Sequence, residues 1–188
     1  MKIGVLAIQG DFAEHITMLK HLGADTAEVR LPAHLSGLDG LILPGGESTT
    51  IGKLSEEYGL LEPLRQFGRS HAVWGTCAGA IFLSRDARRN QPLLGIMDIT
   101  VMRNAFGRQV DSFEADLRVE GLRTPEPYHA VFIRAPIIES VSGEALAIST
   151  LPDGRIVAAR QGKLLATSFH PELTPDTRFH EFFLSLVR

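Results

Sequence analysis

The single cysteine of this chain lies between two glycines, in the segment Gly75-Thr76-Cys77-Ala78-Gly79. A short apolar run, Ala72 to Trp74, predicts a strand before it, and a helix is predicted after it, over Ala80 to Arg85. Flanking glycines permit the sharp strand-to-helix turn from which a nucleophile projects. A following helix N-terminus favours the thiolate, and the Ala78 N–H is a candidate oxyanion donor. Cys77 is therefore a candidate nucleophile, and a buried structural cysteine is the alternative interpretation.

A thiol nucleophile needs a base, because little of a free cysteine is ionised near neutral pH. Of the seven histidines, His15, His21 and His180 fall in predicted helices, and most are expected to be solvated on the surface. His170 differs, because it ends a predicted strand and is followed by Pro171 and Glu172. In an extended segment, residues two apart point to the same side. Glu172 is thus expected to orient the His170 ring toward the thiol, with an exposed loop pair as the alternative.

A glycine pair follows another predicted strand, in Pro44-Gly45-Gly46-Glu47-Ser48. Glycines before a helix can direct backbone N–H groups at a developing oxyanion. A phosphate-binding loop is excluded, because the spacing from Gly46 to Gly52-Lys53 is one residue too long and Leu54 replaces the Ser or Thr. An ordinary turn is the other interpretation.

The surrounding pattern predicts an α/β architecture that places these loops together. Strands are predicted over Lys2–Ile8, Ala27–Leu31, Gly40–Leu43 and Ala72–Trp74, alternating with helices over Asp11–Gly23 and Glu47–Tyr58. Asp11 and Glu14 have capping-box spacing. The second half predicts six further strand-like pieces and a last helix from Thr174-Pro175: Gly95–Met102, Ala115–Val119, Ala130–Arg134, Leu146–Thr150, Ile156–Arg160 and Leu164–Phe169. Open α/β sheets place their sites at the carboxyl ends of parallel strands. We expect one domain, residues 1–188, with a mixed sheet.

The composition excludes several other classes of protein. The 188 residues suit one well-buried domain, and the net charge of -3 has no basic footprint for nucleic acid or an anionic membrane. No apolar stretch approaches the length of a membrane span, and the first apolar run lacks a signal-peptide cleavage site. One cysteine forms no internal disulfide, and no metal-ligand spacing occurs. We expect a cytoplasmic protein with no metal and no cofactor.

At the level of motifs, the chain resembles the class I (triad) glutamine amidotransferases and, more narrowly, the PdxT family of glutaminase subunits of pyridoxal 5′-phosphate synthase. The matching segments run in family order over the whole chain: Gly4–Asp11, Leu41–Thr50, Gly75–Gly79, Arg103–Gln109, Asp111–Glu114, Phe132–Pro136 and Ser168–Glu172. The resemblance implies a single-domain, three-layer, flavodoxin-like α/β fold with a central mixed, mostly parallel sheet. It also implies hydrolysis of L-glutamine to glutamate and ammonia.

The resemblance further implies a role for each matching residue and a partner for the chain. Cys77 would be the nucleophile, with His170 and Glu172 completing the triad. L-Glutamine would be bound by Gly46, Glu47, Ser48, Arg103, Ile133 and Arg134, and Gly46 and Ala78 would form the oxyanion hole. The ammonia would pass to a PdxS-type synthase subunit, a TIM barrel, within a large hetero-oligomer. Docking to that subunit would switch the glutaminase on.

Two other functions fit parts of the pattern. One is a glutaminase subunit that serves a different acceptor. The other is a binding or regulatory subunit that kept the fold without catalysis, although an intact Cys, His and Glu set disfavours it. A DJ-1-like cysteine hydrolase shares the elbow, but the His170-Pro171-Glu172 segment argues against that class.

Overall fold

A computed structural model describes residues 1–103 and 112–188. Within those residues a ten-stranded sheet has the order β2-β1-β3-β4-β12-β11-β9-β6-β5, and β10 pairs with β11. Strands β7 and β8 form a separate antiparallel hairpin. The strands are β1 Lys2–Leu6, β2 Asp25–Val29, β3 Gly40–Leu43, β4 Ala72–Thr76, β5 Ser84–Asp86, β6 Met97–Met102, β7 Ser112–Leu117, β8 Tyr128–Ile133, β9 Ile137–Val141, β10 Leu146–Thr150, β11 Ile156–Gln161 and β12 Leu164–Thr167.

The sheet is parallel where the candidate site lies and largely antiparallel beyond it. Strands β2, β1, β3, β4 and β12 run parallel to one another. Strand β11 is antiparallel to β12, β10 and β9. The carboxyl ends of β3, β4 and β12 therefore meet at one edge, and each is followed by one of the three chemically suggestive segments.

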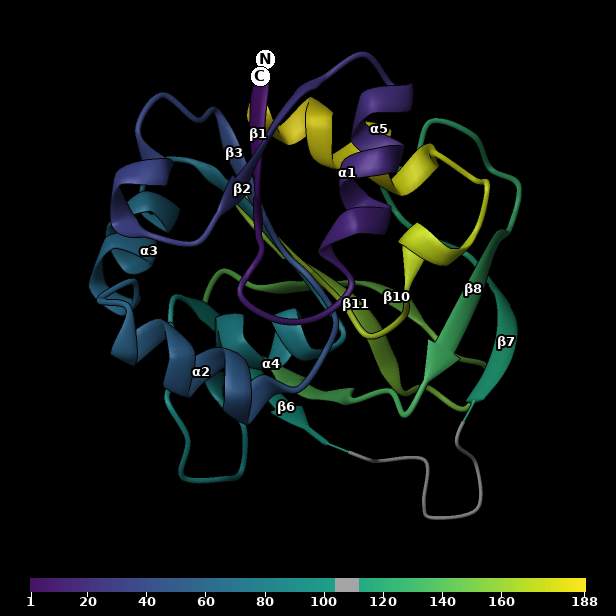
Figure 1. Cartoon of the computed structure of the whole chain (residues 1–188). Coiled ribbons are helices and arrows are strands. Elements are labelled where there is room, and N and C mark those ends of the chain that lie inside the picture. The colour runs from purple at the N-terminus through teal and green to yellow at the C-terminus, as the bar shows by residue number, and fades with distance from the viewer. Residues whose placement is uncertain (104–111) are drawn as a thin grey trace.

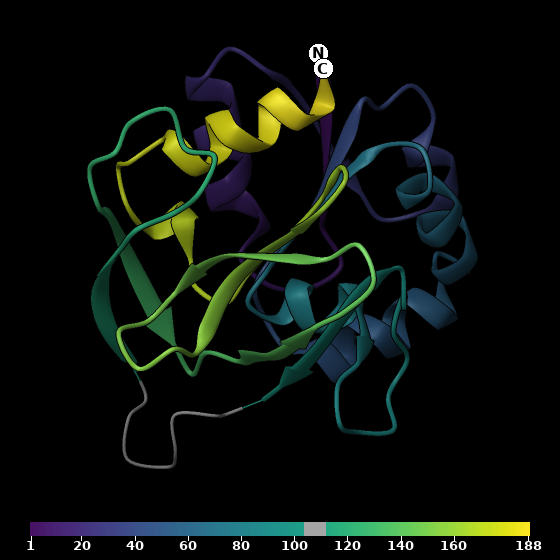
Figure 2. The ribbon, with the colours of Figure 1, turned by 180° about the vertical axis from the view of Figure 1, so that it is seen from behind.

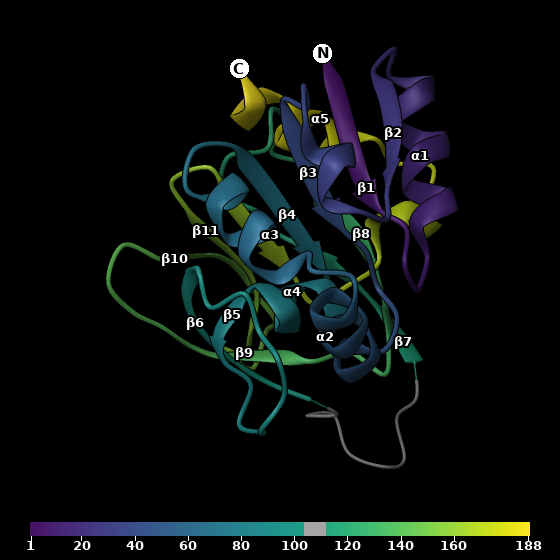
Figure 3. The same cartoon turned by 60° about the vertical axis from the view of Figure 1, so that its left-hand side comes forward.

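Helices cover both faces of the sheet, so the fold has three layers (Figure 1). The helices are α1 Phe12–His21, α2 Ser48–Glu57, α3 Leu61–Gly68, α4 Ala78–Leu83 and α5 Arg178–Val187. One core packs α2, α3 and α4 on one face, and a second packs α1, α5 and the β7–β8 hairpin on the other. Figure 2 shows α5 crossing that second face, and Figure 3 shows α2, α3 and α4 in front of the sheet.

The pleat of the strands explains the two cores. In β1, Ile3 and Val5 belong to one core and Leu6 to the other, because successive side chains point to opposite faces. Both faces of β3 and β4 are buried, which requires continuous apolar sequence. Trp74 from β4 stacks on Phe179 and tilts against Phe183 of α5, so the carboxyl-terminal helix is held against the centre of the sheet.

The α/β class with a mixed sheet is as expected from the sequence, but several local expectations were wrong. Helix α4 ends at Leu83, and Ser84–Asp86 forms a strand instead of continuing the helix. Asp11 makes no side-chain capping bond to α1. The last helix begins at Arg178 instead of Thr174.

Helix α3 and strand β9 had no counterpart in the sequence expectation. Helix α3 tolerates Pro63 because the residue lies in its first turn, where a backbone N–H has no helical acceptor. Strand β9 begins directly after Pro136 and pairs with β6 and β11. Residues 104–111, which include most of the Arg103–Gln109 segment, lie outside the described residues. Within the described parts of the chain, no helix combines the length and apolar character needed to cross a membrane.

Candidate active site

Cys77 occupies a strained turn between β4 and α4. Its φ is 47° and its ψ is -105°, a conformation that non-glycine residues rarely adopt. The Cys77 N–H donates to the Thr167 carbonyl of β12 at 2.8 Å, which ties the turn to the neighbouring strand. Strain of this kind persists only where the surroundings impose it, and it is frequent at functional sites.

Gly75 and Gly79 are required by close backbone contacts at this turn. A Cβ atom on Gly75 would lie 2.4 Å from the Gly79 carbonyl oxygen. A Cβ atom on Gly79 would lie 1.9 Å from the Leu43 carbonyl oxygen of β3. Neither position has room for a side chain, which is the steric reason for the glycine spacing of a nucleophile elbow.

His170 and Glu172 form a hydrogen-bonded pair beside the elbow. The His170 Nδ1 lies 2.7 Å from Glu172 Oε1, and the two side chains are 5% and 0% exposed. The route to this pairing differs from the expected extended segment, because Pro171–Leu173 forms a 3₁₀ turn. That turn brings the carboxylate back onto the ring. The pairing was therefore predicted correctly from an incorrect local geometry.

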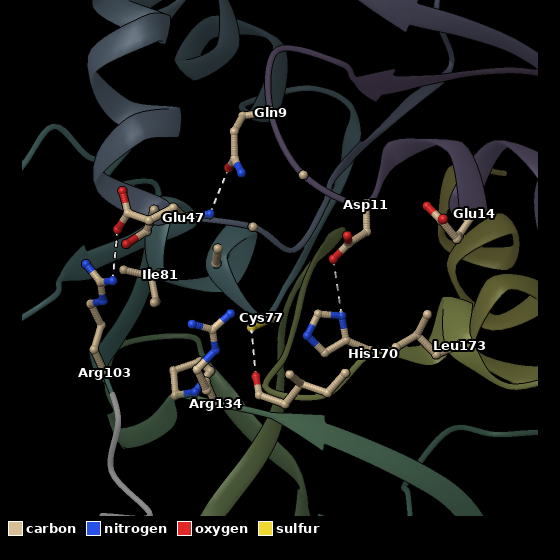
Figure 4. Close-up of a pocket in the computed structure, with 16 residues that line it drawn as sticks. Gln9, Asp11, Glu14, Glu47, Cys77, Ile81, Arg103, Arg134, His170 and Leu173 are labelled. Atoms are coloured by element: carbon tan, nitrogen blue, oxygen red, sulfur yellow. Dashed lines mark hydrogen bonds and ion pairs between the residues drawn. The ribbon is translucent and has the colours of Figure 1, made fainter. Parts of the chain in front are cut away.

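The charges around His170 favour a protonated ring. Burial by itself lowers the pKa of His170, but hydrogen bonds and charge interactions with Cys77 and Glu172 outweigh it and raise the pKa to about 10. Burial also raises the pKa of Glu172, and the bond from His170 opposes that change. The second ring nitrogen of His170 lies on the side of Cys77 (Figure 4). The arrangement can hold a thiolate beside an imidazolium.

The Gly45-Gly46 loop crosses the cavity beside these groups. The Gly45 carbonyl accepts a hydrogen bond from the Asp11 N–H at 3.1 Å. A Cβ atom on Gly45 would lie 2.6 Å from Cε1 of His170, so the loop packs directly on the ring. Gly46 has a φ of 148°, and Glu47 N donates to Gln9 Oε1 at 2.7 Å. Two loops, after β1 and after β3, therefore fix each other.

Polar side chains form the opposite wall. Arg103 Nη2 lies 2.8 Å from Glu47 Oε1, and Arg103 Nη1 donates to Thr49 Oγ1 at 3.1 Å. Glu47 also caps α2 by accepting from the N–H groups of Thr49 and Thr50. Burial is the largest single influence on the pKa of Glu47 and raises it, but hydrogen bonds from the Thr50 hydroxyl and the Thr50 and Thr49 N–H groups, with the Arg103 charge, together lower the pKa to about 2. Glu47 is therefore ionised at neutral pH.

These residues surround one cavity of about 550 Å³ (Figure 4). Of the expected site residues, Gly46, Glu47, Ser48, Cys77, Ala78, Arg103, Ile133, Arg134 and His170 all line it. Glu172 does not, because it lies buried behind His170. Among the lining residues not expected from sequence are Gln9, Asp11 and Glu14, which follow β1. The sequence feature that could have identified these residues is their position just after a predicted parallel strand, where open α/β sheets place their sites.

Two other histidines are exceptions to the expectation that most histidines lie at the surface, which His21, His34, His71 and His129 fit. His15 of α1 and His180 of α5 are both fully buried. Their rings contact Trp74 in edge-on geometry, and His15 Nε2 lies 3.4 Å from Glu172 Oε2. Helical periodicity could have indicated the burial of His15, because His15 precedes the buried Leu19 by one helical turn.

Among the described residues, Asp11, His170 and Glu172 are the one group whose ligand atoms are close enough to suggest a metal. The Nδ1 atom of His170 donates to Glu172, so its lone pair is not free for a cation. Asp11 Oδ2 lies 3.7 Å from the same nitrogen. The group is therefore better described as two carboxylates around one histidine.

The Cys77 elbow after β4, the hydrogen-bonded pair of His170 and Glu172 after β12, and the glycine loop after β3 lie side by side on a three-layer α/β fold. The chain belongs to the SNO glutamine amidotransferase family, whose model matches residues 5–188. It is 56% identical over 190 residues to "Pyridoxal 5'-phosphate synthase subunit PdxT" of Roseiflexus sp. (strain RS-1), covering 99% of this chain and 100% of the relative. It is 58% identical over 191 residues to the protein of the same name from Herpetosiphon aurantiacus, with the same coverage.

Solved structures agree with the family. The structure titled "Crystal structure of glutamine amidotransferase" superposes with a TM-score of 0.93 at 52% identity, covering 98% of each chain. The "Structure of PurLQS from Thermotoga maritima" superposes with a TM-score of 0.73 at 13% identity, covering 100% of this chain and 99% of that one. The second likeness concerns the fold alone.

Proposed function

We propose that this protein hydrolyses L-glutamine to L-glutamate and ammonia, as the glutaminase subunit of a pyridoxal 5′-phosphate synthase. The observation that carries the proposal is the meeting of Cys77, His170 and the Gly45-Gly46 loop in one cavity. Family membership and the full-length identity to PdxT proteins support it.

The first half-reaction forms a thioester. The Cys77 thiolate attacks the side-chain amide carbon of glutamine, and the carbonyl oxygen becomes an oxyanion. The N–H of Ala78, at the start of α4, and the backbone of Gly46 are the proposed oxyanion donors. As the C–N bond breaks, protonated His170 gives its proton to the departing nitrogen, which leaves as ammonia.

The second half-reaction releases glutamate. Neutral His170 removes a proton from water, and the oxygen attacks the thioester carbon. The C–S bond then breaks, returning the thiolate, and the ring is again an imidazolium. Glu172 remains ionised throughout and holds Nδ1 of His170, so the ring presents its other nitrogen to the reaction.

The polar wall is the proposed site for the amino-acid end of glutamine. Arg134 lines the cavity, and no described residue pairs with its guanidinium. A guanidinium can hold a carboxylate through two parallel hydrogen bonds. Ionised Glu47 is suited to the ammonium group of the substrate, and Ser48, Arg103 and Ile133 complete the proposed contacts.

The ammonia needs an acceptor on another subunit. The relatives' name describes a synthase subunit, which supports a synthase partner. We propose a PdxS-type TIM-barrel subunit in a hetero-oligomer, with residues 1–188 acting as one cytoplasmic glutamine amidotransferase domain. Glutamate release should be low in the isolated chain and should rise when the partner binds.

The proposal is tested by mixing the chain with a candidate synthase subunit and following glutamate release and pyridoxal 5′-phosphate formation together. An electrophilic glutamine analogue should label Cys77, and Cys77→Ala should lose both labelling and glutamate release. Full activity in Cys77→Ala would contradict the mechanism. Activation by a different synthase would contradict the partner alone, and no glutamine turnover with any partner would favour a regulatory subunit.

A further inference from the structure

The second carboxylate oxygen of Glu172 has an unusual environment. Oε1 accepts from His170, but Oε2 makes no hydrogen bond within the described residues, and the side chain is fully buried. A buried carboxylate oxygen without a donor is costly. His15 Nε2, from α1, lies 3.4 Å from Oε2. A small movement would bring this nitrogen to hydrogen-bond distance.

His15 is itself held in a buried polar chain. Its Nε2 lies 3.2 Å from Thr76 Oγ1, on the residue just before Cys77. Its Nδ1 lies 3.0 Å from His180 Nε2 on α5. Burial, and then the charges of His180 and His170, lower the pKa of His15 well below its usual value. Neutral His15 therefore carries one N–H, on one of its two nitrogens.

The surroundings select the nitrogen. If the proton were on Nδ1, the Nε2 lone pair could accept from the Thr76 hydroxyl, but it would also face the Glu172 carboxylate. His180 would then have to accept at Nε2 and leave its Nδ1–H as a buried donor without a partner. If the proton is on Nε2, it lies between Thr76 Oγ1 and Glu172 Oε2, which are 3.2 and 3.4 Å from the nitrogen, and His180 donates to His15 Nδ1. That arrangement leaves only the Nδ1 lone pair of His180 unpaired, which is the smaller penalty.

We propose that His15 is a positioning residue for the glutaminase reaction, holding Glu172 through an Nε2–H donor so that the carboxylate stays ionised and fixes His170. The inference rests on the proposed function. It adds a fourth polar group behind the triad, contributed by the helix that follows β1. His180 has the supporting role of setting the tautomer of His15.

The effect acts through charge, so it depends on the titratable groups around His170 and Glu172. Those facing His170 and Glu172 are Asp11 and His15 from the α1 region, Cys77 from the elbow, Tyr128 from β8 and, behind His15, His180 from α5. Without the His15 donor, ionised Glu172 is less stable, the His170 imidazolium is less stable, and so is the Cys77 thiolate. Ionisation of Cys77 should move to higher pH.

The main test compares His15→Leu with His15→Gln, since the glutamine side chain keeps an N–H donor and the leucine does not. The rate of Cys77 alkylation by iodoacetamide is measured against pH in the full chain, and kcat and KM for glutamine are measured with the synthase subunit. His15→Leu should lower kcat about tenfold with little change in KM, and should shift the alkylation midpoint upward. His15→Gln should recover most of both values.

Leu19→Ala is the matched control, because Leu19 is buried on the same helix but lies outside the polar chain. It should lower Tm without moving the alkylation midpoint. A His15→Leu protein that behaves like Leu19→Ala in both assays would overturn the inference.

A measurement on the unmodified protein covers the case in which His15→Leu does not fold. Nitrogen chemical shifts of the His15 ring should show the proton on Nε2. A proton on Nδ1 would overturn the inference. Absence of glutaminase activity in the unmodified complex would contradict the proposed function instead, whatever the tautomer of His15.

Discussion

The two walls of the cavity are built in opposite ways. The wall of the proposed triad (the triad wall) consists of Cys77 and His170, with Glu172 behind the His170 ring, and the side chains of His170 and Glu172 are at most 5% exposed. The wall proposed to bind the substrate (the substrate wall) consists of Gly46, Glu47, Ser48, Arg103 and Arg134, and the side chains of its ion pair, Glu47 and Arg103, are 42% and 23% exposed. The triad wall is held by core strands and helices, whereas the substrate wall is held by loops and a half-exposed ion pair.

This difference suggests that the triad wall sets the geometry of the proposed proton transfer, whereas the substrate wall sets the affinity for glutamine. Buried charges interact strongly and are little affected by salt, so the proton-transfer geometry is set when the core folds. Exposed pairs are weaker and screened, so the wall that would bind glutamine can adjust to substrate or to a docked partner. Changes to the triad wall should therefore affect kcat, and changes to the substrate wall should affect KM.

The largest expected effect comes from Glu172→Gln. The amide can donate to the His170 ring and favour the wrong tautomer, so kcat should fall about a thousandfold with little change in KM. Steady-state glutamine hydrolysis in the synthase complex measures this. Glu144→Gln, at an exposed position, serves as the control. A rise in KM with normal kcat in Glu172→Gln would contradict the assignment of kcat to the triad wall and KM to the substrate wall.

Next in size is Gly79→Ala, which tests whether the core imposes the elbow. The added methyl would meet the Leu43 carbonyl at 1.9 Å, and a backbone atom of a central strand cannot easily move away. The free energy of unfolding should fall by about 3 kcal/mol. Urea unfolding of the isolated chain measures it, and an unchanged midpoint would show that the turn is not constrained by β3.

A smaller effect is expected at the arginines of the substrate wall. Arg134→Met should raise KM by about tenfold to a hundredfold, since a hydrogen-bonded charge pair with the substrate carboxylate would be lost. Arg103→Met should raise KM less, because Arg103 is already paired with Glu47 and Thr49. A larger KM effect at Arg103 would reverse these two roles.

The smallest effect is the pH dependence of stability. The pKa of His170 is raised in the folded protein to about 10, so the charged ring stabilises the fold. This contribution is fully present below about pH 6.5, the ordinary histidine value, and is lost as the pH rises through 10. Because Cys77 contributes to the shift, Cys77→Ala should lose fewer degrees of Tm than the unmodified chain between pH 6.5 and 10. Parallel melting curves would contradict the thiolate-imidazolium pair.

The sequence by itself indicated the proposed chemistry and the order of its residues along the chain. Gly75, Cys77 and Gly79 mark a turn that few other residues permit, and His170 with Glu172 indicated the proposed base and its partner. These signals are local, because a tight turn and a two-residue spacing restrict only neighbouring atoms. The class of fold followed from strand and helix alternation in the same way.

Tertiary structure decided which groups meet across long distances in the chain. The burial of His15 against Glu172, and of His180 against His15, depends on α1 and α5 packing on the same face of the sheet. Helical periodicity can indicate that His15 is buried, but it does not indicate that the ring lies against a carboxylate from another element. The pairing of Glu47 with Arg103 likewise joins α2 to the end of β6. Such contacts arise only when the sheet order is set, because that order places residues far apart in the chain within a few ångströms.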